Sequence, residues 1–316
     1  MSPILTWGLI FIASLATLIL SAEYFIRSAE RIGLVMGIPS FIIGVTLVAL
    51  GTSLPELITS VIAVMEGSAE IVPGNVVGSN ISNICLIMGL IGIMAKDVSF
   101  EFELMKVDLP MMVGATFILG IGFMDGEFSL FEGIICLTGL VIYLVYFISL
   151  GDSRDKEKEL EVPEEAKAKL RWQDPVILLV TIVGIYFSAD YNVTSIVKIA
   201  DILQIGTEFI ALTAVSIGTS LPELIVSISA VRNGATDMAI GNVLGSNVFN
   251  TFAVMGIPRL FGEIHIPDSI ITGSLPVLIG VTLLAVFIVQ DKDINRWVGL
   301  LLVLIYILFL GNLSLA

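Results

Sequence analysis

Long apolar runs separated by short polar connections make up almost the whole chain. A run of about 20 apolar residues is long enough to cross the hydrocarbon core of a bilayer as a helix. By this criterion the pattern predicts ten spanning helices, at residues 4–26, 40–65, 71–95, 107–124, 128–149, 174–195, 207–231, 238–260, 270–289 and 295–314. The one long polar interruption, residues 151–172, joins the fifth and sixth runs. We therefore predict an all-α integral membrane protein in two halves, residues 1–150 and 173–316, joined by this linker.

Composition agrees with a membrane protein. Of the 316 residues, 56% are hydrophobic and only 14% are charged, whereas a soluble domain carries about 25% charged residues. The formal net charge of -14 argues against nucleic acid as a partner. We expect the lipid bilayer to surround the chain, and nothing in the sequence indicates an obligatory protein partner. Two cysteines, Cys85 and Cys136, both in apolar runs, and a single histidine offer no disulfide framework and little basis for a zinc or haem site, so we expect no cofactor.

Basic residues predict how the helices are oriented. With ten spans and the N-terminus outside, 13 of the 15 Lys and Arg residues face the cytoplasm, and only Lys198 and Arg259 face out. Cytoplasmic connections carry an excess of Lys and Arg, so this bias supports the number of spans. It places the protein in the cell membrane with both termini extracellular and the 151–172 linker cytoplasmic.

The chain repeats itself. Residues 51–56 read GTSLPE, and the same six letters return 167 positions later at residues 218–223. Aligned at that offset without a gap, residues 44–90 and 211–257 are identical at 23 of 47 positions. Because five helices, an odd number, lie in each half, the halves insert with opposite orientation. The sequence therefore predicts two inverted five-helix repeats, an architecture that places a transporter's substrate site near the midplane where the repeats meet.

Each GTSLPE stretch places ionisable and helix-breaking residues inside an apolar run. Pro55 and Pro222 have no N–H and clash with the carbonyl four residues earlier, so we expect the helix to kink or unwind there. Non-helical backbone at this depth is tolerated where it lines a cavity, and the freed carbonyls around residues 49–52 and 216–219 could bind a cation. Glu56 and Glu223 are the charged ligands that we expect, because intramembrane carboxylates are costly and usually functional. The alternative is a protonated glutamic acid hydrogen-bonded between helices.

A second repeated stretch adds neutral oxygens. Residues 74–83 and 241–250 share the pattern GNxxGSNxxN. The glycines have the spacing that lets membrane helices approach closely. The serine and the last asparagine of each copy are four residues apart and share a helix face. They would direct oxygens toward the carboxylates, and they are Ser79, Asn83, Ser246 and Asn250. We interpret the remaining amides, Asn75, Asn80, Asn242 and Asn247, as structural.

These oxygens suit a hard cation. Ca²⁺ takes about six to eight oxygen ligands from carboxylates, carbonyls, amides and water, and two carboxylates balance its charge. Na⁺ is bound by the same kind of oxygen. The residues alone do not choose between the two ions.

The two repeated stretches resemble the alpha-repeats of the cation/Ca²⁺ exchanger superfamily, most closely its prokaryotic Na⁺/Ca²⁺ exchangers. The resemblance implies that Glu56 and Glu223 bind both ions and that Asn83 and Asn250 line the central position. It also implies that Thr52 and Thr219 supply backbone carbonyls to Ca²⁺. The implied flanking Na⁺ positions are formed by the hydroxyls of Ser53, Ser79, Ser220 and Ser246 and the carbonyls of Ala49 and Ser216. Some relatives, including the K⁺-dependent branch, carry aspartate where this chain has Asn250, which argues against K⁺ coupling.

The predicted function is an antiporter, not an enzyme, that exchanges Na⁺ for Ca²⁺ by alternating access. The nearest rival is an H⁺/Ca²⁺ exchanger in which the same two glutamates bind protons. A rhomboid-like protease needs a serine with a buried histidine, and His265 lies in a polar connection. A channel would conduct Ca²⁺ without a counter-ion, and the repeat favours alternating access over that behaviour.

Overall fold

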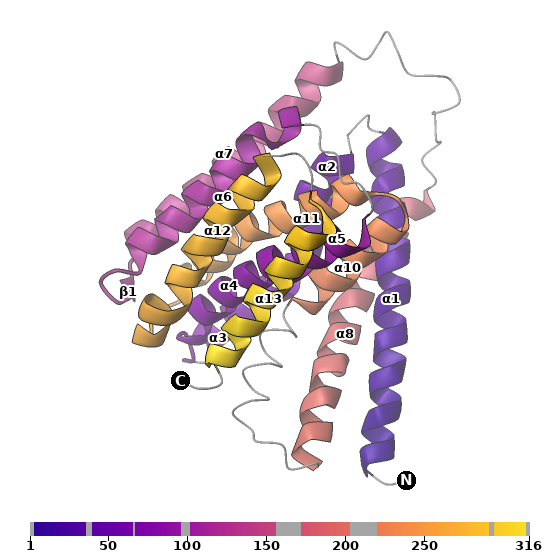
Figure 1. Ribbon diagram of the computed structural model, residues 1–316, viewed down its shortest axis with the longest axis horizontal. Helices are drawn as coiled ribbons and strands as arrows, with labels where there is room; N and C mark the ends of the chain where they lie inside the picture. The colour runs from indigo at the N-terminus through magenta and orange to yellow at the C-terminus, as the bar shows by residue number, and fades with distance from the viewer. Residues whose placement is uncertain are drawn as a thin grey trace.

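The computed structural model describes residues 3–35, 40–65, 67–95, 102–155, 172–202, 220–290 and 294–313. Their architecture is a helical bundle with one short two-stranded sheet. Figure 1 shows α6, α7, α12 and α13 running in a similar direction, whereas α1 and α8, at one side, run at an angle to them and extend beyond the end of the others.

The first half of the chain forms five helical spans. The second and third spans are each built from short α-helical pieces interrupted by a π-helical turn. In order, the elements are α1 (Pro3–Val35), then α2 (Ser40–Ile43), η1 (Gly44–Val48) and α3 (Ala49–Met65), then α4 (Ile71–Ser82), η2 (Asn83–Ile87) and α5 (Met88–Met94), then α6 (Phe102–Gly122), and α7 (Leu130–Asp155).

The second half follows the same order as far as it is described. Its elements are α8 (Gln173–Ile202), α10 (Leu221–Arg232), α11 (Thr236–Phe249) with η5 (Asn250–Val254), the short η6 (Pro258–Leu260), η7 (Ile270–Ser274) with α12 (Leu275–Gln290), and α13 (Arg296–Leu313). The strands β1 (Glu127–Phe128) and β2 (Ile264–His265) pair antiparallel, Glu127 opposite His265, and link the two halves.

Helices are found at the ten predicted positions, although several bounds differ from the prediction. Within the described residues, five segments are long and apolar enough to cross a membrane, Pro3–Gly33, Gly44–Met65, Ile71–Met94, Leu130–Phe147 and Ile270–Val289, and three shorter apolar helices accompany them. The first part of the predicted seventh span, residues 207–219, lies outside the described residues.

The largest errors in the predicted bounds concern helix length. The first span was predicted at residues 4–26, but α1 has 33 residues, which is about 50 Å at 1.5 Å per residue. The sixth was predicted at residues 174–195, but α8 continues to Ile202, and α7 continues to Asp155 inside the predicted linker. In α1 the extension contains Ala29, Glu30 and Arg31, which have good helix propensity, so this helix does not stop where its apolar run stops.

The π-helical turns recur at equivalent positions. Segment η2 begins at Asn83 and η5 at Asn250, 167 positions later. The glycines that follow α3 and α10, Gly67 and Gly234, are separated by the same offset and both have φ of 80°, a conformation that favours glycine. The repeat in the amino-acid sequence is therefore matched by a repeat in local backbone conformation.

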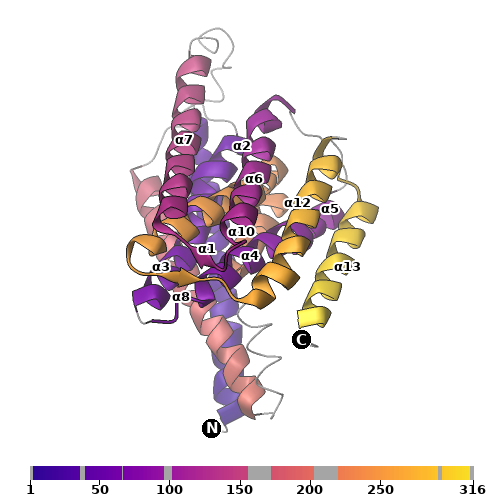
Figure 2. The same cartoon turned by 90° about the vertical axis from the view of Figure 1, so that its left-hand side faces the viewer.

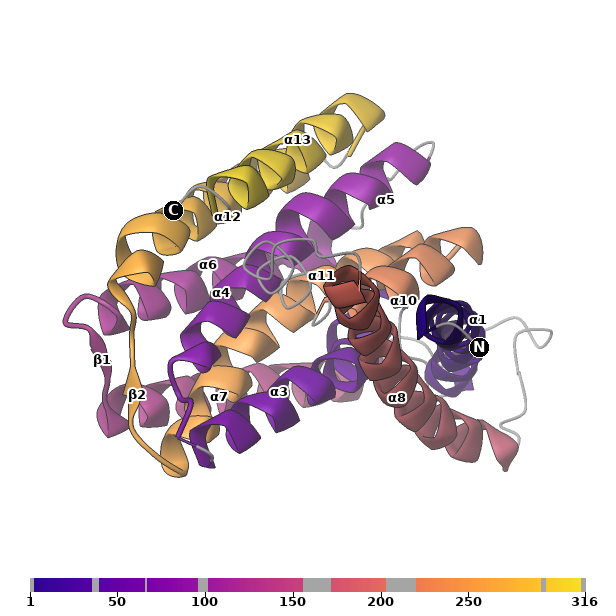
Figure 3. The same ribbon diagram turned by 90° about the horizontal axis from the view of Figure 1, so that it is seen from below.

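The repeated stretches lie in the interior of the bundle. Helix α11 packs against η1, α2, α3 and α10, and α10 also packs against η2. Figures 1 and 3 show α1 on one side of these central helices and α6, α7 and α12 on the other. Figure 2 shows α12 and α13 side by side at one edge.

One backbone contact explains how closely the central helices approach. A Cβ added to Gly245 would lie 2.3 Å from the carbonyl oxygen of Val45, and one added to Gly44 would lie 2.2 Å from that of Met238. Only glycine permits this contact between η1 and α11. The close approach predicted from the glycine spacing is therefore confirmed at Gly245.

Candidate cation-binding site

The first GTSLPE stretch lies in α3, with its polar side chains in the protein interior. Thr52, Ser53 and Glu56 are at most 1% exposed. The helix does not unwind at Pro55, because α3 is continuous from Ala49 to Met65 with Pro55 inside it; a kink at Pro55 stays a prediction. The departure from α-helical geometry comes earlier, in the π-helical turn η1.

The hydroxyl of Thr52 bonds to backbone carbonyls next to that turn. It lies 3.1 Å from the carbonyl oxygen of Val48 and 3.3 Å from that of Ala49. Such back-bonding to a preceding carbonyl is common for Ser and Thr within helices and often bends them. Because this hydroxyl has a single hydrogen, the two carbonyls are alternative acceptors for it.

The second GTSLPE stretch begins a helix where the first continues one. Ser220 precedes α10, and Pro222 and Glu223 lie in its first turn, where proline is well tolerated. The positive end of the helix dipole favours a carboxylate there. The predicted ligands Ser216 and Thr219 lie outside the described residues.

The two glutamates are buried together. Glu56 and Glu223 are each 1% exposed, and their carboxyl groups are close enough to interact with one another. The hydroxyl of Ser53 donates to Glu223 Oε1 at 3.1 Å. Among the described residues, both oxygens of Glu56 and Oε2 of Glu223 have no hydrogen-bond partner. Buried carboxylate oxygens without partners are strongly unfavourable, so a cation or a proton between the two groups would stabilise them.

Amide side chains in η2 and η5, which pack against α10 and α3 respectively, add further oxygens without partners among the described residues. Asn83 and Asn250, the first residues of η2 and η5, are at most 1% exposed. Among the described residues, Asn83 Oδ1 and Asn250 Oδ1 accept no hydrogen bond. The side-chain amide of Asn250 donates to Asn80 Oδ1 at 3.3 Å. π-Helical turns are frequent at functional sites, and here they present the two predicted amide ligands.

The serines of the second repeated stretch are buried as well. Ser79 and Ser246 are 2% and 0% exposed, and Ser220 is 2% exposed. The Ser246 hydroxyl lies 3.5 Å from Asn242 Oδ1. All the predicted site residues that the structure describes are thus buried on packed neighbouring elements, α3, α4, α10, α11 and the π-helical turns.

Three of the four amides interpreted as structural, Asn75, Asn80 and Asn242, form hydrogen bonds to other helices, whereas Asn247 donates to Val243 of its own helix. Asn75 donates to Ser60 Oγ at 3.2 Å, and its repeat equivalent Asn242 donates to Ser227 Oγ at 2.9 Å. Asn242 Oδ1 is a third acceptor within reach of the single hydroxyl hydrogen of Thr52, at 3.2 Å. This link between Asn242 and the first GTSLPE stretch was not predicted from the sequence. The recurrence of Ser60 as Ser227 was an available signal for the two Asn–Ser pairs, but it carries no information about the contact with Thr52.

The donor set suits a hard cation held by oxygen. The described residues contain no group of three or more His, Cys, Asp or Glu side chains that could hold a metal ion. The cluster instead combines two carboxylates with amide, hydroxyl and carbonyl oxygens, which are ligands of Ca²⁺ and not the N and S ligands preferred by zinc.

Comparison with known proteins gives one consistent family. The family model described as sodium/calcium exchanger protein matches residues 6–149 and 174–315. The sodium/calcium exchanger MaX1 of Methanosarcina acetivorans is 32% identical and is matched over 96% of this chain and 97% of its own length. The inner membrane protein YrbG of Escherichia coli is 30% identical, with 96% of this chain and 95% of that protein covered.

A solved structure gives the same result for the fold. The chain is similar to the sodium-calcium exchanger NCX_Mj, soaked with Na⁺ and Sr²⁺, with a TM-score of 0.81 and 30% sequence identity. The match covers 98% of this chain and 99% of that one.

Proposed function

This chain belongs to the sodium/calcium exchanger family, and we propose that it exchanges Na⁺ for Ca²⁺ by alternating access around Glu56 and Glu223. The observation that carries the proposal is the pair of adjacent buried carboxylates with three oxygens unpartnered among the described residues. Family membership supports the choice of Na⁺ and Ca²⁺ as the transported ions.

The proposed ligands divide into two groups. Glu56 and Glu223 bind Ca²⁺ together with the carbonyls of Thr52 and Thr219, and Asn83 and Asn250 line this central position. The flanking Na⁺ positions use the hydroxyls of Ser53, Ser79, Ser220 and Ser246 and the carbonyls of Ala49 and Ser216. Burial of each described member of this set supports the assignment.

Charge balance makes the exchange electrogenic. One Ca²⁺ neutralises the two carboxylates, whereas three Na⁺, the load implied by the exchanger resemblance, leave the site with one positive charge. Moving one elementary charge across the membrane is worth about 2.3 kcal/mol per 100 mV. We therefore expect Ca²⁺ uptake in exchange for internal Na⁺ to accelerate when the inside is positive.

The same charges explain why transport is coupled. The empty site carries two negative charges in a buried position, which costs on the order of several kcal/mol. Without a bound cation the protein therefore changes slowly between its outward-facing and inward-facing states. Transport in each direction across the membrane then requires a bound ion.

The proposal includes the arrangement of the chain in the membrane. Residues 1–150 and 173–316 are inverted repeats joined by the cytoplasmic linker 151–172, with both termini extracellular. The equal offset of η2 and η5 supports the repeat, and the bias of Lys and Arg supports the orientation.

Proteoliposomes containing the purified protein test the coupling ion. One set is loaded with Na⁺ and diluted into Na⁺-free buffer at matched pH, and the other carries only a pH gradient. We expect radioactive Ca²⁺ uptake in the first set, faster at inside-positive potential. Uptake in the second set alone would mean that the coupling ion is H⁺ and not Na⁺. The Glu56 oxygens, which have no partner among the described residues, would then be the protonation sites.

Two substitutions test the site. We expect Glu56→Gln and Glu223→Gln each to abolish Na⁺-driven Ca²⁺ uptake, because each leaves one carboxylate to balance a divalent cation. Glu127→Gln, at an exposed position on β1, is the control and is expected to transport normally. Robust exchange by either site variant would overturn the assignment.

A further inference from the structure

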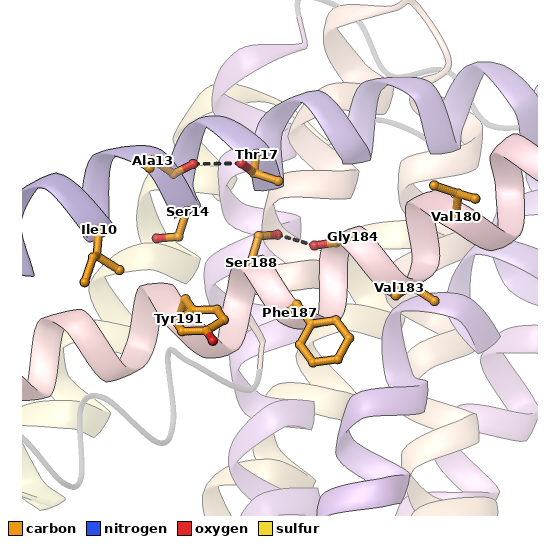
Figure 4. A pocket seen from close by; sticks show the side chains of 10 residues that line it. All are labelled: Ile10, Ala13, Ser14, Thr17, Val180, Val183, Gly184, Phe187, Ser188 and Tyr191. Atoms are coloured by element: carbon orange, nitrogen blue, oxygen red, sulfur yellow. Dashed lines mark hydrogen bonds between the residues drawn. The ribbon is translucent and has the colours of Figure 1, made fainter.

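A groove lies between α1 and α8, away from the buried carboxylates. Its volume is about 530 Å³, within the range of about 300–1,000 Å³ that is typical of small-molecule sites. Figure 4 shows Ile10, Ala13 and Thr17 of α1 facing Gly184 and Tyr191 of α8 across it.

The shape of the groove follows from the helix pair. The two helices approach closely at Gly184, where an added Cβ would lie 2.6 Å from Ser21 Oγ. Toward the N-terminal end of α1, the walls carry the small side chains Ala13, Ser14 and Ser188, which do not fill the space between the helices.

The walls of the groove are apolar although they contain hydroxyl groups. Thr17 donates to the Ala13 carbonyl at 2.9 Å, and Ser188 donates to the Gly184 carbonyl at 2.5 Å (Figure 4). Ser14 likewise bonds to the Phe11 carbonyl at 3.0 Å. A buried water needs about two to four polar partners, and hydroxyls already bonded to their own helices supply few.

The groove opens onto a surface that suits lipid. Two of its own lining residues, Val183 and Phe187 of α8, are large, apolar and exposed, and α1 exposes Leu9 and Ile12 in the same part of the helix. The apolar part of α8 ends at Ser188, and the exposed Tyr191 follows, as expected for a tyrosine at the membrane interface.

From the volume, the apolar walls and the lipid-facing opening, we propose that a phospholipid acyl chain occupies the groove between α1 and α8. The lipid comes from the leaflet on the side of the N-terminus, with its headgroup near Tyr191. The occupant is hydrocarbon because the walls offer few free polar partners and because hydrocarbon is what the bilayer supplies at this surface.

The helices that form the groove also contact the repeated stretch. A Cβ added to Gly51, at the start of GTSLPE, would lie 2.9 Å from Phe25 of α1 and 3.6 Å from Ile182 of α8. Phe25 is eight residues from Thr17, about 12 Å along the helix. A bound acyl chain therefore helps to set the spacing of two helices that cover the buried cluster.

Brominated phospholipid tests the proposal through tryptophan quenching, without any measurement of transport. Trp7, Trp172 and Trp297 are first replaced by Phe. Phe187→Trp then places a reporter in the groove, and Phe117→Trp places one on the exposed surface of α6. Both reporters are reconstituted with brominated lipid and then extracted into detergent. We expect Phe187→Trp to keep most of its quenching and Phe117→Trp to lose it.

Filling the groove supplies the matched control. Ala13→Leu, in the Phe187→Trp background, is expected to remove the retained quenching, whereas Ile12→Phe, one residue away on the exposed face, leaves it intact. Equal loss of quenching at both reporters would overturn the proposal. For the unsubstituted protein, mass spectrometry of the intact chain is expected to show one retained phospholipid. A mass equal to that of the chain alone, or to that of two chains without lipid, would contradict the proposal. Because this measurement uses the unsubstituted protein, it holds even if the variants fail to fold.

Discussion

The hydroxyl of Ser53 donates a hydrogen bond to Glu223 Oε1 across 3.1 Å. Ser53 belongs to the first GTSLPE stretch and Glu223 to the second. A side chain from one half of the chain therefore orients the carboxylate of the other. The bond between Thr52 and Asn242 joins the halves in the same way, so the repeated stretches form one polar cluster.

Ser53→Ala is expected to weaken activation by Na⁺. The substitution removes a proposed Na⁺ ligand and the described donor to Glu223 Oε1. A hydrogen bond to a charged group is worth about 1.5–3 kcal/mol, or roughly 10- to 100-fold in an equilibrium constant. The measurement is the Na⁺ concentration that gives half-maximal exchange. Ser82→Ala is the control, because Ser82 Oγ is buried and has no partner among the described residues; an equal shift in both variants would contradict the prediction.

Replacing Asn242 is expected to cost more stability than replacing its repeat equivalent Asn75. Asn242 donates to Ser227 and accepts from Thr52, whereas Asn75 donates to Ser60 and its Oδ1 has no partner in the described part of the chain. The additional bond is worth about 0.5–1.5 kcal/mol. Thermal unfolding of Asn242→Ala and Asn75→Ala in detergent compares them, and a lower midpoint for Asn75→Ala would show that the extra bond is unimportant.

The two repeated sequence stretches made much of the site predictable from sequence. Glu56 and Glu223 were predicted as site residues because burying a carboxylate inside an apolar run costs free energy, and the chain does so twice at equivalent positions. Both carboxyl groups are buried and close to one another. Asn83 and Asn250 followed from the helix periodicity that places them one turn from a serine. These predictions depend on local spacing and on repetition, which a sequence displays directly.

Backbone geometry was less predictable. Pro55 was expected to kink or unwind its helix, yet α3 continues through it without unwinding, and the π-helical turn lies at residues 44–48. Gly44 lies in that turn and touches the backbone of α11 at Met238, so its surroundings include a helix from the other half of the chain. Contacts between distant segments, including Thr52 with Asn242, have no local signal in the sequence.

Gly245→Ala is expected to abolish transport and to destabilise the protein. The new methyl group would lie 2.3 Å from the Val45 carbonyl oxygen and 2.8 Å from Val45 Cα, so α11 must separate from η1. Overpacking of this kind typically costs about 1–3 kcal/mol, and backbone atoms cannot move aside as a side chain can.

Gly280→Ala is the matched control for this substitution. Gly280 lies in α12, and a Cβ there would meet no atom within 4 Å. Because alanine is favoured over glycine in a helix by up to about 1 kcal/mol, we expect normal transport and unchanged or higher thermal stability. Similar behaviour of the two alanine variants would show that the contact between η1 and α11 does not require glycine.

Tyr143→Phe is expected to destabilise the protein through Asp108. Asp108 is 0% exposed in α6, and Tyr143 of α7 donates to its Oδ1 at 3.0 Å. Its Oδ2 has no partner among the described residues, so removing the tyrosine hydroxyl leaves the buried carboxyl group without a described side-chain donor. The expected loss is about 1–3 kcal/mol, measured as a lower midpoint of thermal unfolding, whereas Tyr24→Phe at an exposed position on α1 should change little.

A double-mutant cycle separates this hydrogen bond from a general packing effect of Tyr143. In an Asp108→Leu background no carboxyl group remains to be left unpaired, so Tyr143→Phe should cost less there than in the unsubstituted protein. The difference between the two costs is the interaction energy of the pair. Equal costs in both backgrounds would assign the effect of Tyr143 to packing alone. Because no described hydrogen bond joins this pair to Glu56 or Glu223, we expect folded Tyr143→Phe protein to keep its Na⁺ dependence while its thermal stability falls.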